Sequence, residues 1–432
     1  MRSANGLVIA APRSGSGKTL VTLGLIAALR RRGLVVAPAK TGPDYIDAAI
    51  LSHVAGVPAI NLDPWAMPNA TSNDLAYHQA ADLGADLVLV EGVMGLFDAA
   101  ADGRGSTADL AAALDLPVIL VADATSQSHS VAALVHGFSS FRKDLRVAGV
   151  ILNRVSTTRH ERLLRDALVP LGIPVLGALP RRDTLHLPAR HLGLVLPAEV
   201  AAFAATIDGA ADVVEVYLDL NRLLALSGPL RPSEAPAAIL PPLGQHIAIA
   251  RDDAFAFIYQ HLIQSWHTAG ATLSFFSPLA DESASADSDA IFLPGGYPEL
   301  HGSTLANAAR FHDSLAAARD RGALIYGECG GYMVLGESLT DAAGVTHRMA
   351  GLLPIRTDIS RPKRALGYRR LTHAGQLPWP RELMGHEFHY SSGSSGADPL
   401  FAATDAVGTP MPPMGAVAGR VMGSYAHVIG VA

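Results

Sequence analysis

The chain of 432 residues contains a single cysteine, Cys329, so it cannot form an internal disulfide. Scarcity of cysteine is typical of proteins in a reducing compartment, and we expect a cytoplasmic location. Charged residues make up only 17% of the chain, the net charge is −6, and no run of lysine or arginine is long enough to form a nucleic-acid-binding face. We therefore expect no nucleic-acid partner.

Long apolar runs are absent as well. No stretch approaches the ~18–20 residues that a membrane span needs, and the segment before Lys18 is too short for a secretory signal, so we expect no membrane association. Hydrophobic residues nevertheless make up 49% of the chain, which is typical of well-buried sheets. Because the chain is long for one core, two or three domains are expected.

A glycine-rich motif lies between an apolar run at 7–11, which suits a strand, and one at 20–29, which suits a helix. The motif reads Ser14, Gly15, Ser16, Gly17, Lys18 and Thr19. This arrangement binds a nucleotide polyphosphate, because backbone N–H groups face the anion, the lysine adds a charge and the threonine hydroxyl can bind Mg²⁺. Pro12 occupies the place of the usual first glycine. An ordinary Gly/Ser turn is the alternative, which the flanking strand and helix disfavour.

Polar residues follow three other predicted strands of the first half, where ligands gather in open α/β sheets. Lys40, Asp44 and Asp47 follow the strand at 34–38, and Glu91 follows the strand at 87–90. These groups suit phosphate and Mg²⁺ contacts, with Thr19, Asp44 and Glu91 as the predicted metal ligands. A solvated Gly-Pro-Asp turn and a solvent-facing glutamate are the alternatives. Asn153, at the end of the strand at 147–154, either contacts adenine or hydrogen-bonds a turn.

The loop at 40–47 contains more charge than nucleotide binding requires. We predict that Lys40 stabilises charge on the transferring phosphoryl group. We also predict that Asp44 and Asp47 are catalytic residues that position metal and the incoming carboxylate or ammonia.

Strand and helix patterns alternate through the first half, which predicts a doubly wound parallel sheet in an α/β protein. Ser106 or Thr107 is expected to cap a helix at 108–114, and another helix is expected over 213–224. A stretch rich in proline and small polar residues then predicts a linker. The predicted organisation is a nucleotide-binding domain at 1–226, a linker at 227–244 and a second α/β domain at 245–432.

Cys329 follows a predicted strand at 323–326 and is flanked by glycines, which indicates a sharp strand-to-helix turn. Such a turn is expected to expose the sulfur and to lower the thiol pKa through nearby helix N–H groups. The N–H groups of Gly330 and of Gly295 and Gly296, after the strand at 290–294, would form an oxyanion hole. An inert buried cysteine is the alternative, and the glycines favour a nucleophile.

A thiol nucleophile needs a base, and the last fifty residues supply His386, His389 and His427 as candidates. Their distances along the sequence cannot choose among them, because such a group is assembled in space.

The combination of motifs resembles one family, the corrin a,c-diamide synthases, which are glutamine-dependent amidating enzymes of the cobalamin pathway. The resemblance covers nearly the whole chain and rests on residues 14–19, 40–47, 61–65, 91–98, 294–299, 328–332 and 423–427. The first half resembles the dethiobiotin-synthetase type of P-loop ATPase. The second half resembles a class I glutamine amidotransferase of the cobyric-acid type.

The resemblance implies a carbon–nitrogen ligase that uses ATP, Mg²⁺, L-glutamine and a corrin polycarboxylic acid. It implies that His427 activates Cys329, which forms a thioester with glutamine and releases ammonia. In the first domain, ATP would convert the a and c acetate carboxylates to acyl phosphates, which ammonia then amidates. Ile429 stands two residues after His427, where family members often have histidine and many class I amidotransferases have glutamate. The third member of the Cys–His site is therefore unassigned.

The substrate is either metal-free hydrogenobyrinic acid or cobalt-containing cobyrinic acid. We favour the metal-free acid, because the composition, rich in alanine and arginine, suits bacteria that use the aerobic route. Two other functions are considered: a nickel-tetrapyrrole a,c-diamide synthase, and a non-catalytic P-loop regulator of the partitioning type. The regulator would not need a glutamine-hydrolysing domain. The sequence does not decide between a monomer and a homodimer.

Overall fold

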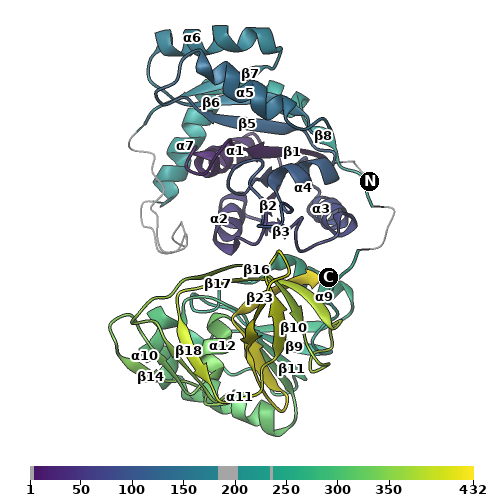
Figure 1. The fold of residues 1–432 in the computed structure, drawn as a ribbon, viewed down its shortest axis with the longest axis vertical. Helices are drawn as coiled ribbons and strands as arrows, with labels where there is room; N and C mark the ends of the chain where they lie inside the picture. The colour runs from purple at the N-terminus through teal and green to yellow at the C-terminus, as the bar shows by residue number, and fades with distance from the viewer. Residues whose placement is uncertain (1–3, 183–202, 234–236) are drawn as a thin grey trace. The chain divides into compact units, whose positions relative to one another are not determined.

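The computed structural model describes residues 4–182, 203–233 and 237–432. The chain divides into two compact units, one up to residue 237 and one from residue 238 (Figure 1). Each unit contains a largely parallel sheet with helices packed against it, so the α/β class predicted for both halves is confirmed.

The main sheet of the first unit has the strand order β3-β2-β4-β1-β5-β6-β7, and all these neighbours are parallel. Its strands are β1 (Asn5–Ala10), β2 (Val36–Thr41), β3 (Ile60–Leu62), β4 (Leu87–Glu91), β5 (Val118–Asp123), β6 (Val147–Val155) and β7 (Val175–Pro180). Most of their residues are buried, as expected for a parallel sheet covered on both faces.

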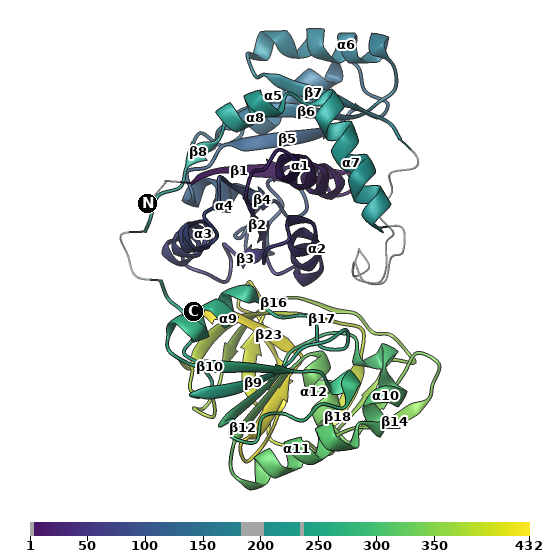
Figure 2. The same cartoon turned by 180° about the vertical axis from the view of Figure 1, so that it is seen from behind.

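Two layers of helices cover this sheet. Helices α1, α2 and α7 pack together on one face, and α3 to α6 share an apolar core on the other (Figures 1 and 2). The helices are α1 (Lys18–Arg31), α2 (Tyr45–Ala55), α3 (Asn69–Leu83), α4 (Thr107–Ala113), α5 (Ser130–Ser140), α6 (Thr158–Leu168), α7 (Phe203–Tyr217) and α8 (Leu220–Ala225).

The helix ends follow the local sequence, with one correction. Ser106 caps α4 in a capping box with Asp109, so the predicted cap is confirmed. The prediction of a single helix over 213–224 is wrong, because α7 ends at Tyr217 and α8 begins at Leu220. Between them Leu218 bridges to Gly177, and the Asp219 side chain accepts a hydrogen bond from the N–H of Arg222 at the start of α8.

The segment predicted as a linker, 227–244, begins inside the first unit. Its residues Gly228–Pro229 form β8, which pairs antiparallel with Asn5 and Gly6 of β1.

The second unit contains three sheets. The largest is β10-β9-β11-β12-β22-β21, parallel except for β21. Its strands are β9 (His246–Ala250), β10 (Thr272–Phe276), β11 (Ala290–Leu293), β12 (Leu324–Glu328), β21 (Ala416–Ala418) and β22 (Val421–Ser424). Its helices are α9 (Gln260–Thr268), α10 (Gly302–Asn307), α11 (Ala309–Asp320) and α12 (Gly330–Leu335).

Two smaller sheets complete the second unit. The four-stranded sheet comprises β13 (Ser338–Thr340), β14 (Thr346–Arg348), β15 (Ile355–Asp358) and β18 (Ser392–Ser395). The five-stranded sheet comprises β16 (Ala365–Thr372), β17 (Glu382–His389), β19 (Phe401–Thr404), β20 (Pro410–Met414) and β23 (Ala426–Val431). The last strand, β23, carries His427, and its antiparallel neighbour β17 carries His386 and His389.

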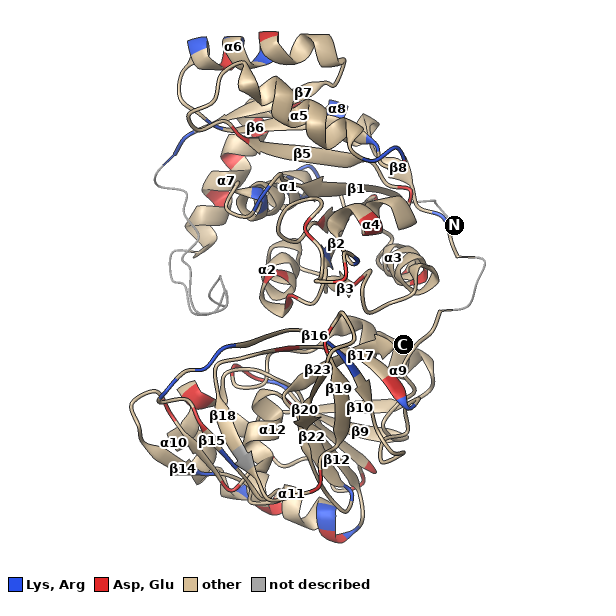
Figure 3. Ribbon diagram, in the orientation of Figure 1, with Lys and Arg blue, Asp and Glu red and all other residues tan. Residues whose placement is uncertain are grey.

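Charged residues of both signs are interspersed in each unit, for example along α6 (Figure 3). Within the described residues, every helix is either too short or too polar to cross a lipid bilayer.

Candidate active sites

The phosphate loop joins β1 to α1, and two of its glycines, Gly15 and Gly17, have φ angles of 78° and 85°. A Cβ atom at Gly17 would lie 2.3 Å from Asn153 Nδ2, so only glycine fits there. Asn153 Nδ2 donates to the carbonyl of Ser16 at 2.8 Å, and its Oδ1 accepts from the N–H of Arg154 at 3.0 Å. Of the two predicted roles for Asn153, the structure therefore contains the hydrogen bond to a turn, here the phosphate loop.

An arginine that the sequence analysis did not single out also supports this loop. Arg154 has a φ of 60°, an unusual value for a residue other than glycine. Its guanidinium donates to the carbonyl of Gly15 at 2.8 Å and to Asp123 Oδ2 at 2.7 Å. Arg13 approaches the same Asp123 oxygen at 3.5 Å. Burial opposes ionisation of Asp123, but hydrogen bonds from Thr125 and the Arg154 charge keep its pKa below the ordinary value.

A cavity of about 390 Å³ opens beside the phosphate loop, at the carboxyl ends of β6 and β7. Its lining includes Gly17, Thr125, Asn153, Pro180 and Val213. An apolar wall from α7 beside polar groups of the loop suits the base and ribose of a nucleotide.

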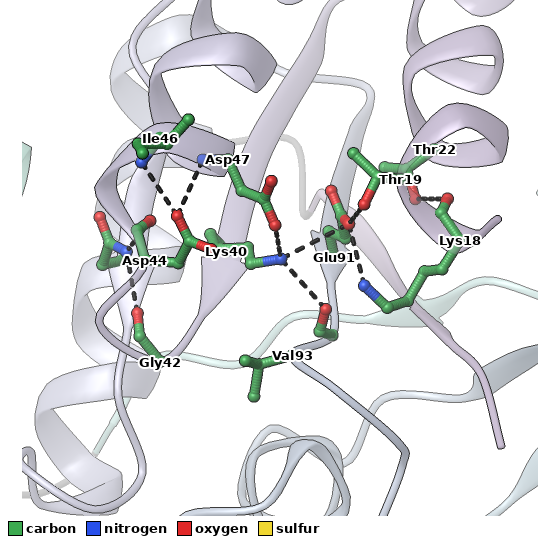
Figure 4. A network of polar contacts seen from close by, with 12 residues as sticks. Lys18, Thr19, Thr22, Lys40, Gly42, Asp44, Ile46, Asp47, Glu91 and Val93 are labelled. Carbon is green, nitrogen blue, oxygen red and sulfur yellow. Dashed lines mark hydrogen bonds and ion pairs between the residues drawn. The ribbon is translucent and has the colours of Figure 1, made fainter. Parts of the chain in front are cut away.

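Glu91 is the centre of a buried polar network in the first unit (Figure 4). Its Oε1 accepts a 2.9 Å hydrogen bond from Lys18 Nζ and a 2.6 Å hydrogen bond from Thr19 Oγ1. Burial alone would raise the pKa of Glu91, but the charges of Lys18 and Lys40 lower it to about 2. Glu91 is therefore ionised at neutral pH.

The second oxygen of this carboxylate fits a hard cation. Glu91 Oε2 is buried and lacks a hydrogen-bond partner among the residues that the structure describes. A carboxylate oxygen and the Thr19 hydroxyl beside a phosphate loop are the donors that Mg²⁺ prefers in nucleotide sites.

Lys40 lies between two carboxylates (Figure 4). Its ammonium contacts Asp47 Oδ2, the carbonyl of Gly92 at 3.2 Å and Glu91 Oε1 at 3.4 Å. Burial disfavours the charged lysine, but Asp47 and Glu91 outweigh burial and raise the pKa of Lys40. Lys40 is therefore a permanent positive charge inside the site.

Asp44 has a structural partner that the sequence analysis did not anticipate. Its Oδ1 accepts hydrogen bonds from the N–H groups of Ile46 and Asp47, both at 3.0 Å, and so caps α2 (Figure 4). Burial and the neighbouring Asp47 raise the pKa of Asp44 to about 7. Among the described residues no three His, Cys, Asp or Glu side chains converge as a metal cluster, and Lys40 lies between Asp44 and Glu91 (Figure 4).

In the second unit, Cys329 lies where β12 turns into α12, as the flanking glycines predicted. Its φ of 46° is strained for a residue with a side chain, a feature that clusters at functional sites. The N–H of Cys329 donates to the carbonyl of Ser424 at 2.8 Å, which fixes the turn to β22. At Gly331 a Cβ atom would lie 1.9 Å from the carbonyl oxygen of Leu293, so the turn requires glycine there.

The environment of the sulfur corrects the prediction of an exposed thiol with a lowered pKa. Cys329 is only 3% exposed, and its Sγ lies 3.9 Å from the carbonyl oxygen of Phe388 on β17. Burial, followed by the charge of Glu299, raises the thiol pKa; the N–H of Gly330 acts in the opposite direction but is weaker. The resting group is therefore a thiol, and a base must remove its proton.

The three glycines predicted for the oxyanion hole lie around this thiol. A Cβ atom at Gly295 would lie 2.4 Å from His427 Cε1 and 3.2 Å from Cys329 Cβ, so Gly295 touches both residues. A Cβ atom at Gly330 would lie 3.0 Å from the nitrogen of Gly296, so the turn at Cys329 and the loop after β11 are in close contact. Backbone N–H groups next to a nucleophile are suited to binding an oxyanion.

Of the three candidate bases, His427 is the one that shares Gly295 as a neighbour with Cys329. It is 1% exposed, and burial, followed by His386 and His389, lowers its pKa well below the ordinary value, so its imidazole is neutral. His386 is its partner across the β17–β23 pair. Both ring nitrogens of His389 are engaged elsewhere, with Glu387 at 2.8 Å and Ser391 at 2.9 Å.

Glu328 is a buried carboxylate that the sequence motifs did not indicate as a site residue. Its Oε2 lies 3.7 Å from His427 Nδ1. The available signal was its place at the end of a buried strand, immediately before Cys329, which resembles the place of Glu91 in the first unit.

Comparisons with known proteins identify the two domains that contain these sites. Residues 7–195 match the model of the CobQ/CobB/MinD/ParA nucleotide binding domain, and residues 246–431 match the CobB/CobQ-like glutamine amidotransferase domain. The fold and the sites thus define a protein that joins a P-loop nucleotide-binding domain to a glutamine amidotransferase domain.

Curated relatives named hydrogenobyrinate a,c-diamide synthase align over nearly the full length of both chains. The relative from Brucella suis biovar 1 (strain 1330) is 56% identical, with 98% of each chain covered. Those from Rhizobium meliloti (strain 1021) and Rhodobacter capsulatus are 51% and 48% identical, and at least 98% of each chain is covered. The chain belongs to the family of hydrogenobyrinate a,c-diamide synthases, which confirms the resemblance to corrin a,c-diamide synthases.

Proposed function

We propose that the protein amidates the a and c acetate carboxylates of hydrogenobyrinic acid, with glutamine as the nitrogen donor and ATP as the activating substrate. The observation that carries this proposal is the presence of two buried reaction centres in one chain. One is the Cys329–His427 pair, and the other is the phosphate loop with Glu91. The names of the full-length relatives support the choice of substrate.

In the glutaminase reaction, His427 takes the thiol proton as Cys329 Sγ attacks the carboxamide carbon of glutamine. The N–H groups near Gly296 and Gly330 stabilise the oxyanion of the tetrahedral intermediate. Collapse of this intermediate breaks the C–N bond, and His427 returns the proton to the leaving ammonia. Water then hydrolyses the thioester to glutamate and restores the thiol.

In the synthetase reaction, a substrate carboxylate oxygen attacks the γ-phosphorus of ATP and ADP leaves. Ammonia attacks the resulting acyl phosphate, which forms the amide and releases phosphate. Lys18 and Lys40 stabilise negative charge on the phosphoryl group. Asp44 and Asp47 lie beside Lys40 and position the incoming carboxylate or ammonia.

Thr19 and Glu91 would hold Mg²⁺, which when bound neutralises charge on the nucleotide phosphates. Asn153 and Arg154 keep the loop in its phosphate-binding shape through their bonds to Ser16 and Gly15.

The metal-free corrin is preferred over cobyrinic acid and over a nickel tetrapyrrole because of the names of the relatives. Turnover measured with each of the three acids tests this choice. Greater turnover of a metal-containing acid would overturn it. Whether the protein acts as a monomer or a homodimer is measurable by light scattering.

The division of labour is tested with Cys329→Ala. Because the chain has one cysteine, this variant removes the only thiol and leaves the first unit unchanged. We expect glutamine-dependent diamide formation to be abolished, and synthesis with ammonium salt at raised pH to continue near the wild-type rate. A folded variant that binds ATP but cannot use ammonia would contradict the proposal. Glu337→Gln, at an exposed ion pair with Arg356, is a matched control.

A further inference from the structure

The glutaminase centre lacks the orienting carboxylate at its usual sequence position. Ile429, two residues after His427, is apolar and 2% exposed. A histidine that acts as a base generally needs a third group to fix its tautomer and to stabilise its cationic form. We propose that Glu328, the residue directly before the nucleophile, is the positioning residue for His427. This inference rests on the proposed glutamine hydrolysis.

The direction of the Glu328 side chain is set by its own strand. Tyr326 and Glu328 are two residues apart on β12, so their side chains project on the same side. The Tyr326 hydroxyl donates to Glu328 Oε1 at 3.1 Å, and the N–H of Val428 on β23 donates to the same oxygen at 3.0 Å. With Oε1 held by two donors, Oε2 lies 3.7 Å from His427 Nδ1.

These contacts connect two different sheets. β12 belongs to the six-stranded sheet and β23 to the five-stranded sheet. The Glu328–Val428 bond therefore fixes the strand that carries the base to the strand that carries the nucleophile. Glu328 is 2% exposed and His427 is 1% exposed, so water competes little for either group.

Glu387, a further carboxylate near the thiol, is already engaged. Glu387 on β17 pairs through Oε2 with Arg369 at 2.8 Å and through Oε1 with His389 at 2.8 Å. Loss of either contact would leave a buried charge without its partner, which is costly. Glu328, in contrast, has one oxygen directed at His427.

The required tautomer follows from this geometry. An ionised Glu328 Oε2 accepts the proton of His427 Nδ1, which leaves the Nε2 lone pair to take the thiol proton of Cys329. When His427 becomes an imidazolium, the same carboxylate offsets its charge in a buried site. A neutral donor in place of Oε2 would favour the opposite tautomer, in which Nε2 carries a proton and cannot act as the base.

This role makes hydrolysis depend on ionisation of Glu328. Burial raises the pKa of Glu328 to about 8, although the Val428 N–H and the Tyr326 hydroxyl partly oppose this rise. The groups that face it are Tyr326 on its own strand, Cys329 at the turn and His427 on β23. Two further carboxylates, Glu299 and Glu387, act on the thiol. We expect kcat/KM for glutamine to rise as the pH approaches 8.

Glu328→Gln is the sharpest test, because the glutamine oxygen can still accept from Tyr326 and Val428. Its NH₂ group must then face His427 Nδ1 and impose the wrong tautomer. We expect glutaminase kcat/KM to fall about 10²–10⁴-fold and its rise toward pH 8 to be lost. Ammonia-dependent synthesis should stay within twofold. Glu328→Asp, which keeps the charge, should retain more activity than Glu328→Gln.

The single cysteine provides a second readout. Alkylation by iodoacetamide, followed by mass spectrometry, reports Cys329 alone. Its rate between pH 7 and 8 should fall in Glu328→Gln and in His427→Ala, and stay unchanged in the Glu337→Gln control. Adding Glu328→Gln to His427→Ala should cause no further loss, because Glu328 acts through the histidine.

Three results would overturn the inference: near-wild-type hydrolysis by Glu328→Gln, an unchanged pH profile, or losses that multiply in the double variant. If circular dichroism shows that Glu328→Gln does not fold, Glu328→Asp takes its place. Wild-type hydrolysis with an unchanged pH profile in Glu328→Asp would then overturn the inference. Failure of the proposed function itself would look different, since the wild-type protein would then not hydrolyse glutamine.

Discussion

Lys40 Nζ lies 3.4 Å from Glu91 Oε1, the same oxygen that accepts hydrogen bonds from Lys18 and Thr19. Two lysines, the half-buried Lys18 and the buried Lys40, therefore share one buried carboxylate, and Asp47 balances the charge of Lys40. A γ-phosphate that enters this site brings negative charge to both lysines at once. The carboxylate then loses part of its compensation by the lysines, and for this reason we expect a cation to bind at Glu91.

We predict that Glu91→Gln raises the Mg²⁺ concentration required for half-maximal synthesis. The amide can still accept from Lys18 and Thr19, so the fold is preserved, but the charge that attracts the cation is lost. Titration of ammonia-dependent synthesis with Mg²⁺ measures the effect, and glutamine hydrolysis at Cys329 serves as the control because it belongs to the other unit. An unchanged Mg²⁺ dependence would remove Glu91 from the metal site.

A second prediction separates the capping role of Asp44 from a catalytic one. Asparagine caps helices about as well as aspartate, so Asp44→Asn should leave stability nearly unchanged. If Asp44 also positions substrate, amide formation should fall at least tenfold with both nitrogen donors, while ATP affinity stays within a few-fold. Asp47→Asn should lower amide formation to a similar extent, but it should also lower stability, because it leaves the buried Lys40 without its close carboxylate.

The control for this pair is Asp44→Ala, which removes the cap and should cost about 1 kcal/mol. Calorimetric ATP binding and a coupled ADP assay provide the two measurements. Near-wild-type amidation by both asparagine variants would reduce the loop to a structural turn.

Replacement of His427 and replacement of His389 should have very different effects on glutamine hydrolysis. His427→Ala should lower glutamine hydrolysis by about 10²–10⁴-fold, the range expected for a lost general base. His389→Ala should reduce the melting temperature more than hydrolysis, because it breaks the bonds to Glu387 and Ser391 and a stacked contact with Tyr425. A glutaminase assay and a thermal melt on each variant check this. Equal losses of hydrolysis would refute the assignment of His427.

Part of both sites could be predicted because strand ends are visible in the sequence. Apolar runs locate the parallel strands, and the carboxyl ends of such strands meet at one edge of a sheet. That rule was enough to select Lys40, Glu91 and Cys329, and in the structure Lys40 and Glu91 lie at the carboxyl ends of β2 and β4, while Cys329 directly follows β12.

Other features depend on contacts between distant parts of the chain. Cys329 is buried because Phe388 and His427 come from strands that pair only in the folded state, so the sequence suggested an exposed thiol. Glu328 was missed for the same reason, since its neighbour His427 lies far along the chain. The direction of the Asn153 amide, toward the phosphate loop, likewise cannot be read from its own strand.

The last prediction concerns the effect of pH on stability. Burial raises the pKa of Glu328 to about 8, above its ordinary value of 4.5, so the folded state holds this proton more tightly than the unfolded state. The resulting stabilisation is complete below the unfolded pKa and is lost as the pH rises through about 8. Glu328→Gln stays neutral throughout. Relative to this variant, the wild-type protein should therefore lose stability between pH 5 and 8.5, by about 1 kcal/mol or more.

Urea unfolding of both proteins at pH 5, 7 and 8.5 measures this difference. Two of the three tryptophans, Trp266 and Trp379, are buried in the second unit, so a Trp65→Phe background makes fluorescence report that unit. Glu299 also has a raised pKa, of about 7, but it is present in both proteins and cancels from the comparison. Parallel stability curves would mean that Glu328 is already ionised in the folded protein at pH 5. A gap that widens with pH, together with lost hydrolysis in Glu328→Gln, would mean that the carboxylate destabilises the fold while it positions the base.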